Sequence, residues 1–277
     1  MALSRLSGDG GASQDDDAVP LPLGDWREFR ASLVDKEVAE SQPEGAPSGV
    51  WASRICQENL HLLQQQDRKL AQEGIWAHAT QLPETGGLVI STHKVVGLTN
   101  DPRYWQLVII LLEHGQRGST GLILNRPSSA TVGDLLGWGY LQTEGTASKV
   151  QSAFQENCVY LGGFYAPNVI ARQAVRVLHG HKHLNGCQEL VPGIYRGGEL
   201  AAADEILGGK LRAQDFRFFA GAVRWGPGQL QQELATGFWY TAACSRSIVL
   251  KQCLQLPVPL WQEVLELMGS EYSRRRR

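Results

Sequence analysis

The stretch FRFFAGAVRWGPGQLQQELATGFW, Phe216–Trp239, contains in order the signals of a strand, a tight turn, a helix and a second strand. Its first eight residues, Phe216–Val223, are apolar enough for a strand that is buried on both faces. Gly221 within that run allows another backbone to approach closely. We therefore predict a buried strand over 216–223 and a second strand over 238–243, with a helix between them.

The helix between these strands has recognisable start and stop residues. Gly226 is a tolerated N-cap, and Pro227 suits the first helical position because it has no N–H to satisfy. Gln229 is placed to reach back and accept the Gly226 N–H, as in half of a capping box. Gly237 is typical of the residue that follows a helix. These signals predict a helix over 227–236.

Two interpretations of this segment are open. In the first, it is a packing corner that fixes the helix against the sheet. In the second, Gln229 and Glu233 lie on one helix face, four residues apart, and line a pocket with Trp225 as a wall.

Composition predicts one core domain without a membrane span. The chain has 277 residues, of which 43% are hydrophobic, and can bury a sizeable core. Its longest strongly apolar run, Leu107–Leu112, is far shorter than the roughly 20 residues that a spanning helix needs. The net charge of -2 disfavours nucleic acid as a partner, although four arginines end the chain at Arg274–Arg277.

Cysteine and histidine spacing predicts neither a disulfide framework nor a bound metal. The five cysteines are widely separated and include no C-x-x-C pair, which fits a reducing compartment. His179, His181 and His183 alternate and would share one face of a strand, but no carboxylate accompanies them at a ligand spacing. We therefore expect no metal and no cofactor.

The chain divides into four predicted parts. They are a disordered acidic leader (1–23), a helical N-terminal extension (24–75), an α+β domain (76–270) and a basic tail (271–277). The extension contains one helix capped by Asp25 and a second from about Trp51 to Glu73, joined by a Pro- and Gly-rich linker over 41–49.

Short β-branched runs outnumber regular alternation of strands and helices in the domain. This pattern favours an α+β fold, with a mixed β-sheet core, flanking helices and the two extra N-terminal helices. The predicted strands cover 86–92, 106–113, 120–125, 158–161, 174–179, 189–195, 216–223 and 238–243. Besides the helix over 227–236, we predict helices over 199–207 and 259–268 and a short helix from Thr131 to about Trp138, opened by a capping box with Asp134.

A candidate ligand site follows from residues at strand ends. Pro127 holds the preceding Arg126 in an extended conformation that directs its guanidinium beyond the sheet, where an anion could bind. Backbone N–H groups of a Gly-Gly turn and the helix start at Pro227 could join it. The alternative is that Asn125 closes a turn and Arg126 pairs with a carboxylate such as Glu113 or Glu233. The full candidate set is Asn125, Arg126, Gly162, Gly163, Trp225, Gln229 and Glu233.

Four motifs together resemble the AlgH-like (YqgE) family of uncharacterised proteins. They are GLILNRP (121–127), VYLGG (159–163), PGIY (192–195) and the segment 217–239. The resemblance covers about 86–249. The segments DWREFRASLV, ETGGLVIST and TAACS resemble the photosynthetic-eukaryote branch, which implies a chloroplast location; a cytoplasmic location is the alternative. The sequence departs from the family pattern at Phe164, where proline is usual, and at Arg224, where a small residue is usual.

Three functional hypotheses remain from the sequence. The first is a non-catalytic binding or regulatory module, with a small anion or a protein as its partner. The second is an enzyme or binder that acts on an anionic small molecule at the NRP, GG and WGPGQL turns. The third is the transcriptional regulator that the family label implies. No nucleophile with a matched base can be named from spacing, so catalytic residues are unknown and the sequence leaves open whether the chain is an enzyme.

Overall fold

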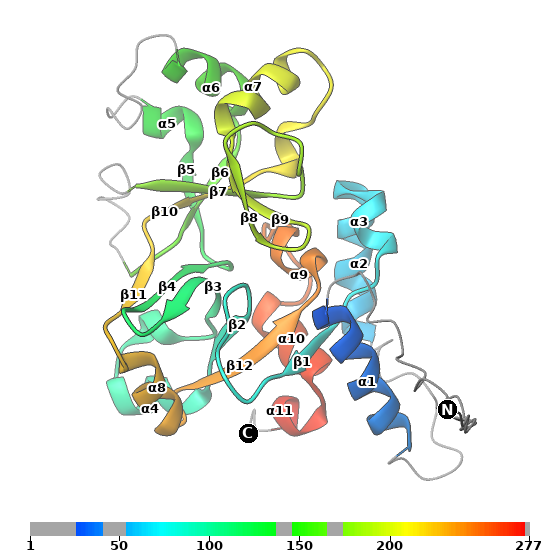
Figure 1. The fold of residues 1–277 in the computed structure, drawn as a ribbon, viewed down its shortest axis with the longest axis vertical. Coiled ribbons are helices and arrows are strands. Elements are labelled where there is room, and N and C mark those ends of the chain that lie inside the picture. Colours follow the sequence, from blue (N-terminus) through cyan, green and yellow to red (C-terminus); the bar gives the residue numbers. More distant parts are fainter. Residues whose placement is uncertain (1–25, 41–53, 137–145, 165–173, 275–277) are drawn as a thin grey trace, which may run out of the picture.

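The computed structural model describes residues 26–40, 54–136, 146–164 and 174–274 (Figure 1). It confirms an α+β fold, with two six-stranded sheets, A and B, in place of a single one. The predicted leader and linker lie outside the described residues, as do 275–277. The division into four parts stays a prediction. Within the described residues, no helix combines the length and apolar character that crossing a bilayer requires.

Sheet A is antiparallel throughout. From edge to edge its strands are β1 (Ala77–Ala79), β12 (Trp239–Cys244), β2 (Leu88–Ser91), β3 (Val108–Gly115), β4 (Gly118–Ile123) and β11 (Val223–Trp225). The predicted hairpin between β3 and β4 is confirmed, and Gly115 pairs with Gly118 across its turn. A register shift between Leu111 and Glu113 adds a bulge to β3.

Sheet B is mixed, because β10 runs parallel to β6 while its other pairings are antiparallel. Its strands, in order, are β5 (Pro127–Thr131), β6 (Cys158–Leu161), β10 (Arg217–Ala220), β7 (Val175–His179), β9 (Ile194–Gly197) and β8 (Cys187–Val191). The single strand predicted over 189–195 is wrong. The chain reverses at Pro192 and Gly193, whose φ of +79° suits a tight turn, and forms the hairpin β8–β9.

The strand predicted over 216–223 is also wrong as one element, because the chain passes there from sheet B to sheet A. Gly221 interrupts the extended run with a φ of +73°, so β10 ends at Ala220 and β11 begins at Val223. The crossing is tightly packed: a Cβ on Gly162 would lie 2.5 Å from the carbonyl oxygen of Gly221.

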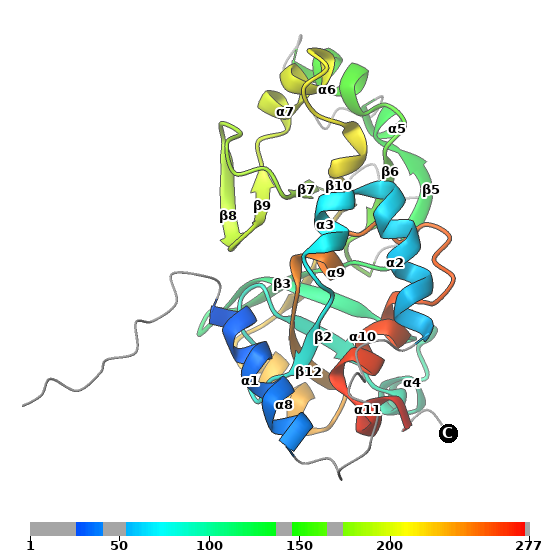
Figure 2. The same cartoon turned by 90° about the vertical axis from the view of Figure 1, so that its right-hand side faces the viewer.

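Helices cover both ends of the molecule and one flank (Figures 1 and 2). They are α1 (Trp26–Glu40), α2 (Arg54–Gln66), α3 (Arg68–Gln72), α4 (His93–Thr99), α5 (Val132–Leu136), α6 (Thr146–Phe154), α7 (Glu199–Leu207), α8 (Gln229–Ala235), α9 (Arg246–Leu250), α10 (Leu260–Met268) and α11 (Ser270–Arg274). Both views place α5, α6 and α7 beyond sheet B, at the end opposite α8 and α11. The helices predicted over 199–207 and 259–268 are confirmed as α7 and α10.

Two helix boundaries differ from the prediction for local reasons. The predicted second helix is split at Asp67, whose carboxylate caps α3 by accepting the backbone N–H groups of Lys69 and Leu70. Helix α8 begins at Gln229 with Gly228 as its N-cap, at a φ of +73°, and not at Pro227. The predicted contact of Gln229 is nevertheless present, since its side-chain oxygen accepts the Gly226 N–H at 3.0 Å.

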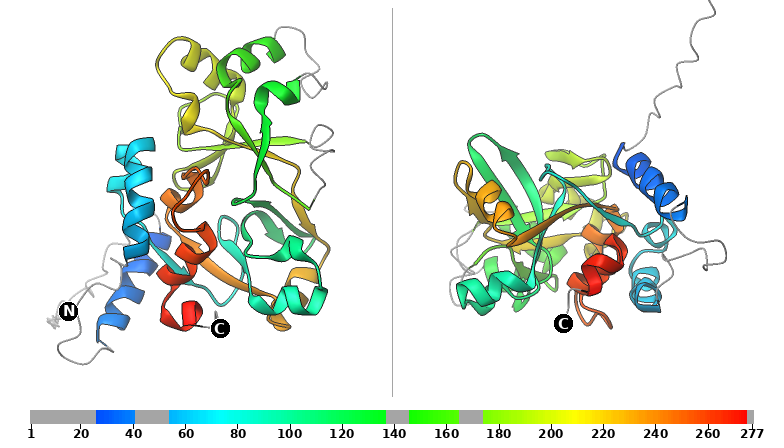
Figure 3. Two further views of the ribbon diagram at one scale, coloured as in Figure 1. Left: turned by 180° about the vertical axis from the view of Figure 1, so that it is seen from behind. Right: turned by 90° about the horizontal axis from the view of Figure 1, so that it is seen from below.

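The N-terminal helices pack on the domain. Viewed from behind and from below, they lie beside α10 (Figure 3). Asn59 of α2 is fully buried and donates to Glu263 of α10 at 2.6 Å. Glu263 in turn is 2.6 Å from the ammonium of Lys251, and both of these side chains are buried. Helix α2 is thus joined to the main core through a buried ion pair.

The described residues form three apolar cores. The largest lies between the facing sides of the two sheets, includes α10, and contains Ile110, Phe219 and Trp261. The second lies between the outer face of sheet B and helices α5, α6 and α7, around Phe218. The third lies between the outer face of sheet A and α8, around Trp225. The second and third cores each border a hollow at the surface.

Candidate functional site

Asn125 and Arg126 of the candidate set are bonded to the backbone. The Asn125 amide accepts the Val108 N–H at 3.1 Å and donates to the Gln106 carbonyl at 2.7 Å, which joins the end of β4 to the start of β3. Arg126 donates to the carbonyls of Asn125 and Trp105, so its observed partners are carbonyl groups and not Glu113 or Glu233. Burial lowers the pKa of the Arg126 guanidinium below its usual value.

The two glycines of the candidate set lie where the sheets meet. Gly162 donates its N–H to Ala220 at 2.8 Å and accepts the Ile123 N–H at 3.1 Å, so it links sheet B to sheet A. Gly163 follows it and is buried. The N–H and the carbonyl group of Gly162 are therefore both used in hydrogen bonds within the fold.

Trp225, Gln229 and Glu233, the other three candidates, do come together. They line a hollow of about 220 Å³ with Tyr104 and Trp239, which we call the indole hollow. Phe164 and Arg224, the two positions that depart from the family pattern, line it as well.

The Glu233 carboxylate lines the indole hollow, and both of its oxygens accept hydrogen bonds. One of its oxygens accepts the indole N–H groups of Trp225 at 2.9 Å and Trp239 at 2.6 Å. The other accepts the side-chain amide of Gln229 at 2.9 Å. Three donors on one half-buried carboxylate fix both indole rings and α8 in place. This arrangement is that of a structural anchor.

The open side of the indole hollow is aromatic with a polar edge. The Tyr104 ring lies 4.8 Å from Phe164 and 5.9 Å from Trp239, between centroids. Burial, with a further contribution from the Glu233 charge, raises the pKa of the Tyr104 hydroxyl, which stays a neutral phenol at physiological pH. Arg224 is exposed beside it.

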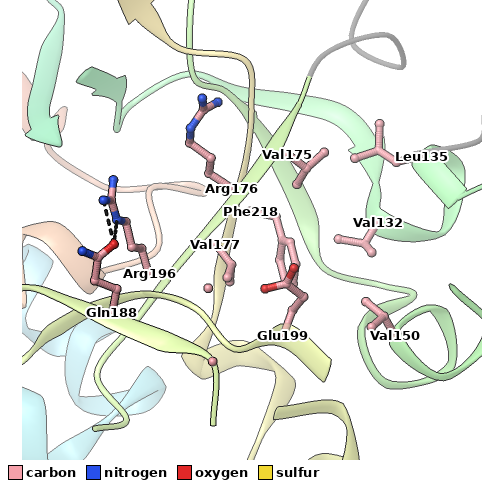
Figure 4. A pocket seen from close by; sticks show the side chains of 12 residues that line it. Val132, Leu135, Val150, Val175, Arg176, Val177, Gln188, Arg196, Glu199 and Phe218 are labelled. Atoms are coloured by element: carbon pink, nitrogen blue, oxygen red, sulfur yellow. Dashed lines mark hydrogen bonds between the residues drawn. The ribbon is translucent and has the colours of Figure 1, made fainter. Parts of the chain in front are cut away.

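A second hollow, which we call the valine pocket, lies on the outer face of sheet B and has a volume of about 310 Å³ (Figure 4). Strand pairing builds its floor, because Val177 lies opposite Phe218 and Val175 opposite Ala220 in the β7–β10 register. Its apolar lining consists of Val132, Leu135, Val150, Val175, Val177 and Phe218. In Figure 4 Val132, Leu135, Val150 and Val175 lie on one side of the Phe218 ring.

The charged side chains that line the valine pocket differ in the number of hydrogen bonds and ion pairs that they make. Arg196 donates to the Gln188 side chain at 2.7 and 3.0 Å and pairs with Glu113 at 3.3 Å. Arg176 donates only to the Gly221 carbonyl, at 3.4 Å, among the described residues. The side chain of Glu199, the first residue of α7, makes no hydrogen bond or ion pair with any described residue.

Comparison with known proteins places the chain among relatives. A sequence model of the AlgH-like family matches residues 95–273. The chain belongs to the AlgH-like family. A UPF0301 protein of Streptomyces coelicolor is 34% identical over 184 residues, which are 65% of this chain and 84% of that protein. A UPF0301 protein of Myxococcus xanthus is 31% identical over 172 residues, or 61% and 84% of the two chains.

Two solved structures are similar to this AlgH-like chain. The crystal structure of a Corynebacterium diphtheriae protein has a TM-score of 0.51 and 20% identity, and the match covers 71% of this chain and 93% of that one. The solution structure of Pseudomonas aeruginosa AlgH has a TM-score of 0.45 and 21% identity, with 63% and 85% covered. The first of these supports the fold. Both hollows lie within the matched region of the AlgH-like chain, which begins after α1, α2 and α3.

The valine pocket is missing from the sequence-based candidates. A signal was available in the alternation Val175, Arg176, Val177 on a predicted strand, which places two valines on one face. That β7 pairs with β10, and so brings Phe218 beside them, depends on long-range pairing that spacing along the chain does not reveal.

The three alternating histidines are engaged individually. His183 lies 2.9 Å from Glu205, His181 lies 3.4 Å from Asp215, and His179 is fully buried. Among the residues that the structure describes, no group of three or more histidine, cysteine, aspartate or glutamate side chains could hold a metal ion.

Proposed function

We propose that this AlgH-like protein is a non-catalytic module that binds a small molecule with an apolar part in the valine pocket. The observation that carries the proposal is the pocket itself: about 310 Å³, an apolar floor and wall, and charged groups beside them. Small-molecule sites are concave and mainly apolar, with a few polar groups that fix orientation, and begin at about this volume.

The chemistry of the lining supports binding over catalysis. The described side chains around the valine pocket are those of valine, leucine, phenylalanine, arginine, glutamine and glutamate, besides two glycines. Covalent catalysis needs a serine, threonine, cysteine, lysine or similar nucleophile with a base within hydrogen-bond reach. Hydrocarbon contact and charge recognition are what the described lining offers.

A second candidate function is the binding of an anionic small molecule at the indole hollow. Exposed Arg224 and the Tyr104 hydroxyl favour it, because both can donate to an anion beside aromatic walls. Trp225, Gln229 and Glu233 would then support the walls of that site. Asn125, Arg126, Gly162 and Gly163 lie outside this lining, so the larger anion site that unites all seven residues rests on the strand-end argument alone.

The remaining family-based expectations are proposals of the same kind. A role in transcription and a chloroplast location both rest on resemblance. Import of a fluorescent fusion into isolated chloroplasts would support that location, and retention outside them would count against it.

Methyl-detected NMR tests the valine pocket as a binding site. Three probes that share a branched hydrocarbon chain are titrated into protein labelled at valine and leucine methyls: leucine, 4-methylpentanoate and 3-methylbutylamine. We expect at least one to shift the methyl signals of Val132, Val150 and Val177, which line the pocket. The variant Val150→Phe, which fills the pocket, should abolish the shifts while keeping a dispersed spectrum.

The matched control for this experiment is Arg224→Gln, an exposed substitution at the indole hollow. It should leave the shifts at the valine pocket unchanged. Shifts confined to residues around Trp225 and Trp239 would contradict the proposal and favour the second candidate.

A further inference from the structure

The lining of the valine pocket includes charged residues of both signs, and the strand register separates them. Arg176 lies opposite Phe219 in the β7–β10 pair, and Arg196 lies opposite Leu178 in the β7–β9 pair. Opposed residues share a face of the sheet, and Phe219 and Leu178 belong to the main core between the two sheets. Both arginines are therefore directed to the inner face of sheet B, away from the outer face that carries Phe218.

The outer part of the valine pocket combines apolar side chains with one carboxylate. Gln188 lies opposite Arg196 and shares its inner face, so the described side chains that remain are those of valine, leucine, phenylalanine and Glu199. The Glu199 side chain is half-buried and makes no hydrogen bond or ion pair with a described residue. We infer that the ligand of the valine pocket is a small aliphatic amine, with a positively charged ammonium group on a branched hydrocarbon body. The inference rests on the proposed function and assigns the chemistry of its ligand.

Glu199 supplies the site for the ligand's ammonium group. A carboxylate beside apolar surface loses part of its hydration, and donors that approach it restore favourable interactions. An ammonium group brings a positive charge and three donors, which suits an acceptor-only group. Glu199 is the first residue of α7, and its full negative charge exceeds the roughly half positive charge of that helix end, so a cation is attracted there.

The apolar wall supplies the site for the hydrocarbon body of the amine. Val132, Leu135 and Val150 lie on one side of the Phe218 ring and line the pocket with it (Figure 4). The volume of about 310 Å³ is at the low end of the range for small-molecule sites, which suits a short branched chain. A carboxylate ligand would meet the like charge of Glu199, and no described side chain on the outer face donates a hydrogen bond to it.

Titration of a matched set of probes into the full chain, followed by the valine and leucine methyl signals, tests this inference. 3-Methylbutylamine carries the ammonium group and the branched hydrocarbon. 3-Methylbutan-1-ol replaces the ammonium by a neutral hydroxyl, 4-methylpentanoate replaces it by a carboxylate, and methylamine lacks the branched chain. Leucine adds a carboxylate beside the ammonium. We expect each of these changes to weaken binding by about tenfold, as for the loss of one hydrogen bond to a charged group.

A charge-removing variant connects the preference for the amine to its residue. In Glu199→Gln, 3-methylbutylamine should lose its advantage over 3-methylbutan-1-ol, because a neutral amide does not attract the ammonium group. Added salt should reduce that advantage in the wild type and not in the variant, since ions screen a half-buried carboxylate that solvent reaches. The matched control is Glu58→Gln, at an exposed carboxylate outside the pocket, which should leave the preference unchanged.

Failure of the inference and failure of the proposed function give different results. If 3-methylbutan-1-ol, leucine or 4-methylpentanoate binds as tightly as the amine and shifts the methyl signals of Val132 and Val150, the pocket is a site but its ligand is not an amine. If Glu199→Gln keeps the preference for the amine, the assigned ammonium site is wrong. If no probe binds at millimolar concentration, both proposals are overturned.

Discussion

Two half-buried glutamates, Glu233 in the indole hollow and Glu199 in the valine pocket, lie in short helices beside aromatic rings and differ in their bonding. The Glu233 carboxylate accepts three hydrogen bonds from side chains, whereas the Glu199 carboxylate accepts none from any described residue. A carboxylate whose two oxygens are both bonded to side chains of the fold holds those side chains together, and one without such bonds is available to a ligand. The position of a charged residue in a hollow therefore says less about function than its remaining bonding capacity.

The largest effect on stability is expected at Glu263, whose carboxylate is fully buried. It bonds the ammonium of Lys251 and the amide of Asn59, and all three side chains are buried. The variant Glu263→Gln leaves a buried ammonium without a counter-charge, and we expect it to lower the free energy of unfolding by about 3 to 5 kcal/mol. Guanidinium denaturation measures this. A loss below about 0.5 kcal/mol, the size expected for exposed Glu58→Gln, would mean that this pair is not buried in solution.

The comparison of Glu199 with Glu233 requires that the region around sheet B is well packed. In a loosely packed region any substitution would have little effect on stability. His179, on β7, tests this. Its Nε2 donates to the Gly197 carbonyl at 2.8 Å and its Nδ1 accepts the His181 N–H at 3.1 Å, so the neutral ring is fully bonded. Burial lowers the pKa of His179 from 6.5 to about 4.

The sign of the pH effect follows from that pKa. Between pH 6.5 and about 4 the unfolded chain takes up a proton on this residue and the folded chain does not. Neutral His179 therefore lowers no part of the free energy of unfolding above pH 6.5. As the pH falls from 6.5 to about 4, the free energy of unfolding decreases by about 3 kcal/mol in total. Unfolding free energies measured across this range should fall less steeply in His179→Gln. His183→Gln, at a half-exposed ring, is the control, and equal slopes for wild type and His179→Gln would show a loosely packed region.

The anchor role of Glu233 predicts an intermediate effect. A glutamine at this position has one acceptor oxygen, so its NH₂ group faces either the two indole N–H groups or the Gln229 amide. We expect Glu233→Gln to lower the free energy of unfolding by about 1.5 to 3 kcal/mol and to shift tryptophan emission to longer wavelength. Gln232→Ala, at the exposed neighbouring position on α8, is the control. An unchanged emission maximum would show that the indole rings do not depend on Glu233.

Local signals predicted much of the fold. The β3–β4 hairpin, the cap of Thr131 by Asp134 and the contact from Gln229 to Gly226 each involve residues close in sequence, and each is present. The elements that were missed or joined depend on distant partners or on single glycines. β1 is three residues long and exists through pairing with β12, while the strand over 216–223 is divided by the positive φ at Gly221.

The candidate site was only partly predictable for the same reason. Spacing on one helix predicted that Gln229 and Glu233 lie together. It did not reveal that the Glu233 carboxylate is already occupied by the Gln229 amide and by the indole N–H groups of Trp225 and Trp239. The valine pocket requires β7 to pair with β10 and α5, α6 and α7 to cover them. Glu199 gives no signal in the sequence, because the absence of a partner is a property of the folded chain.

The smallest effect on stability is expected at Glu199, in the pocket to which we assign the function. In Glu199→Gln, the loss of a favourable interaction with the N-terminal end of α7 is opposed by relief from keeping a charge beside Phe218 without a partner. We expect the free energy of unfolding to change by less than about 0.5 kcal/mol, measured beside Glu233→Gln in the same denaturant series. A loss as large as that of Glu233→Gln would mean that Glu199 is also bonded within the fold. Both glutamates would then be structural, and the Glu199 carboxylate would not be available to a ligand.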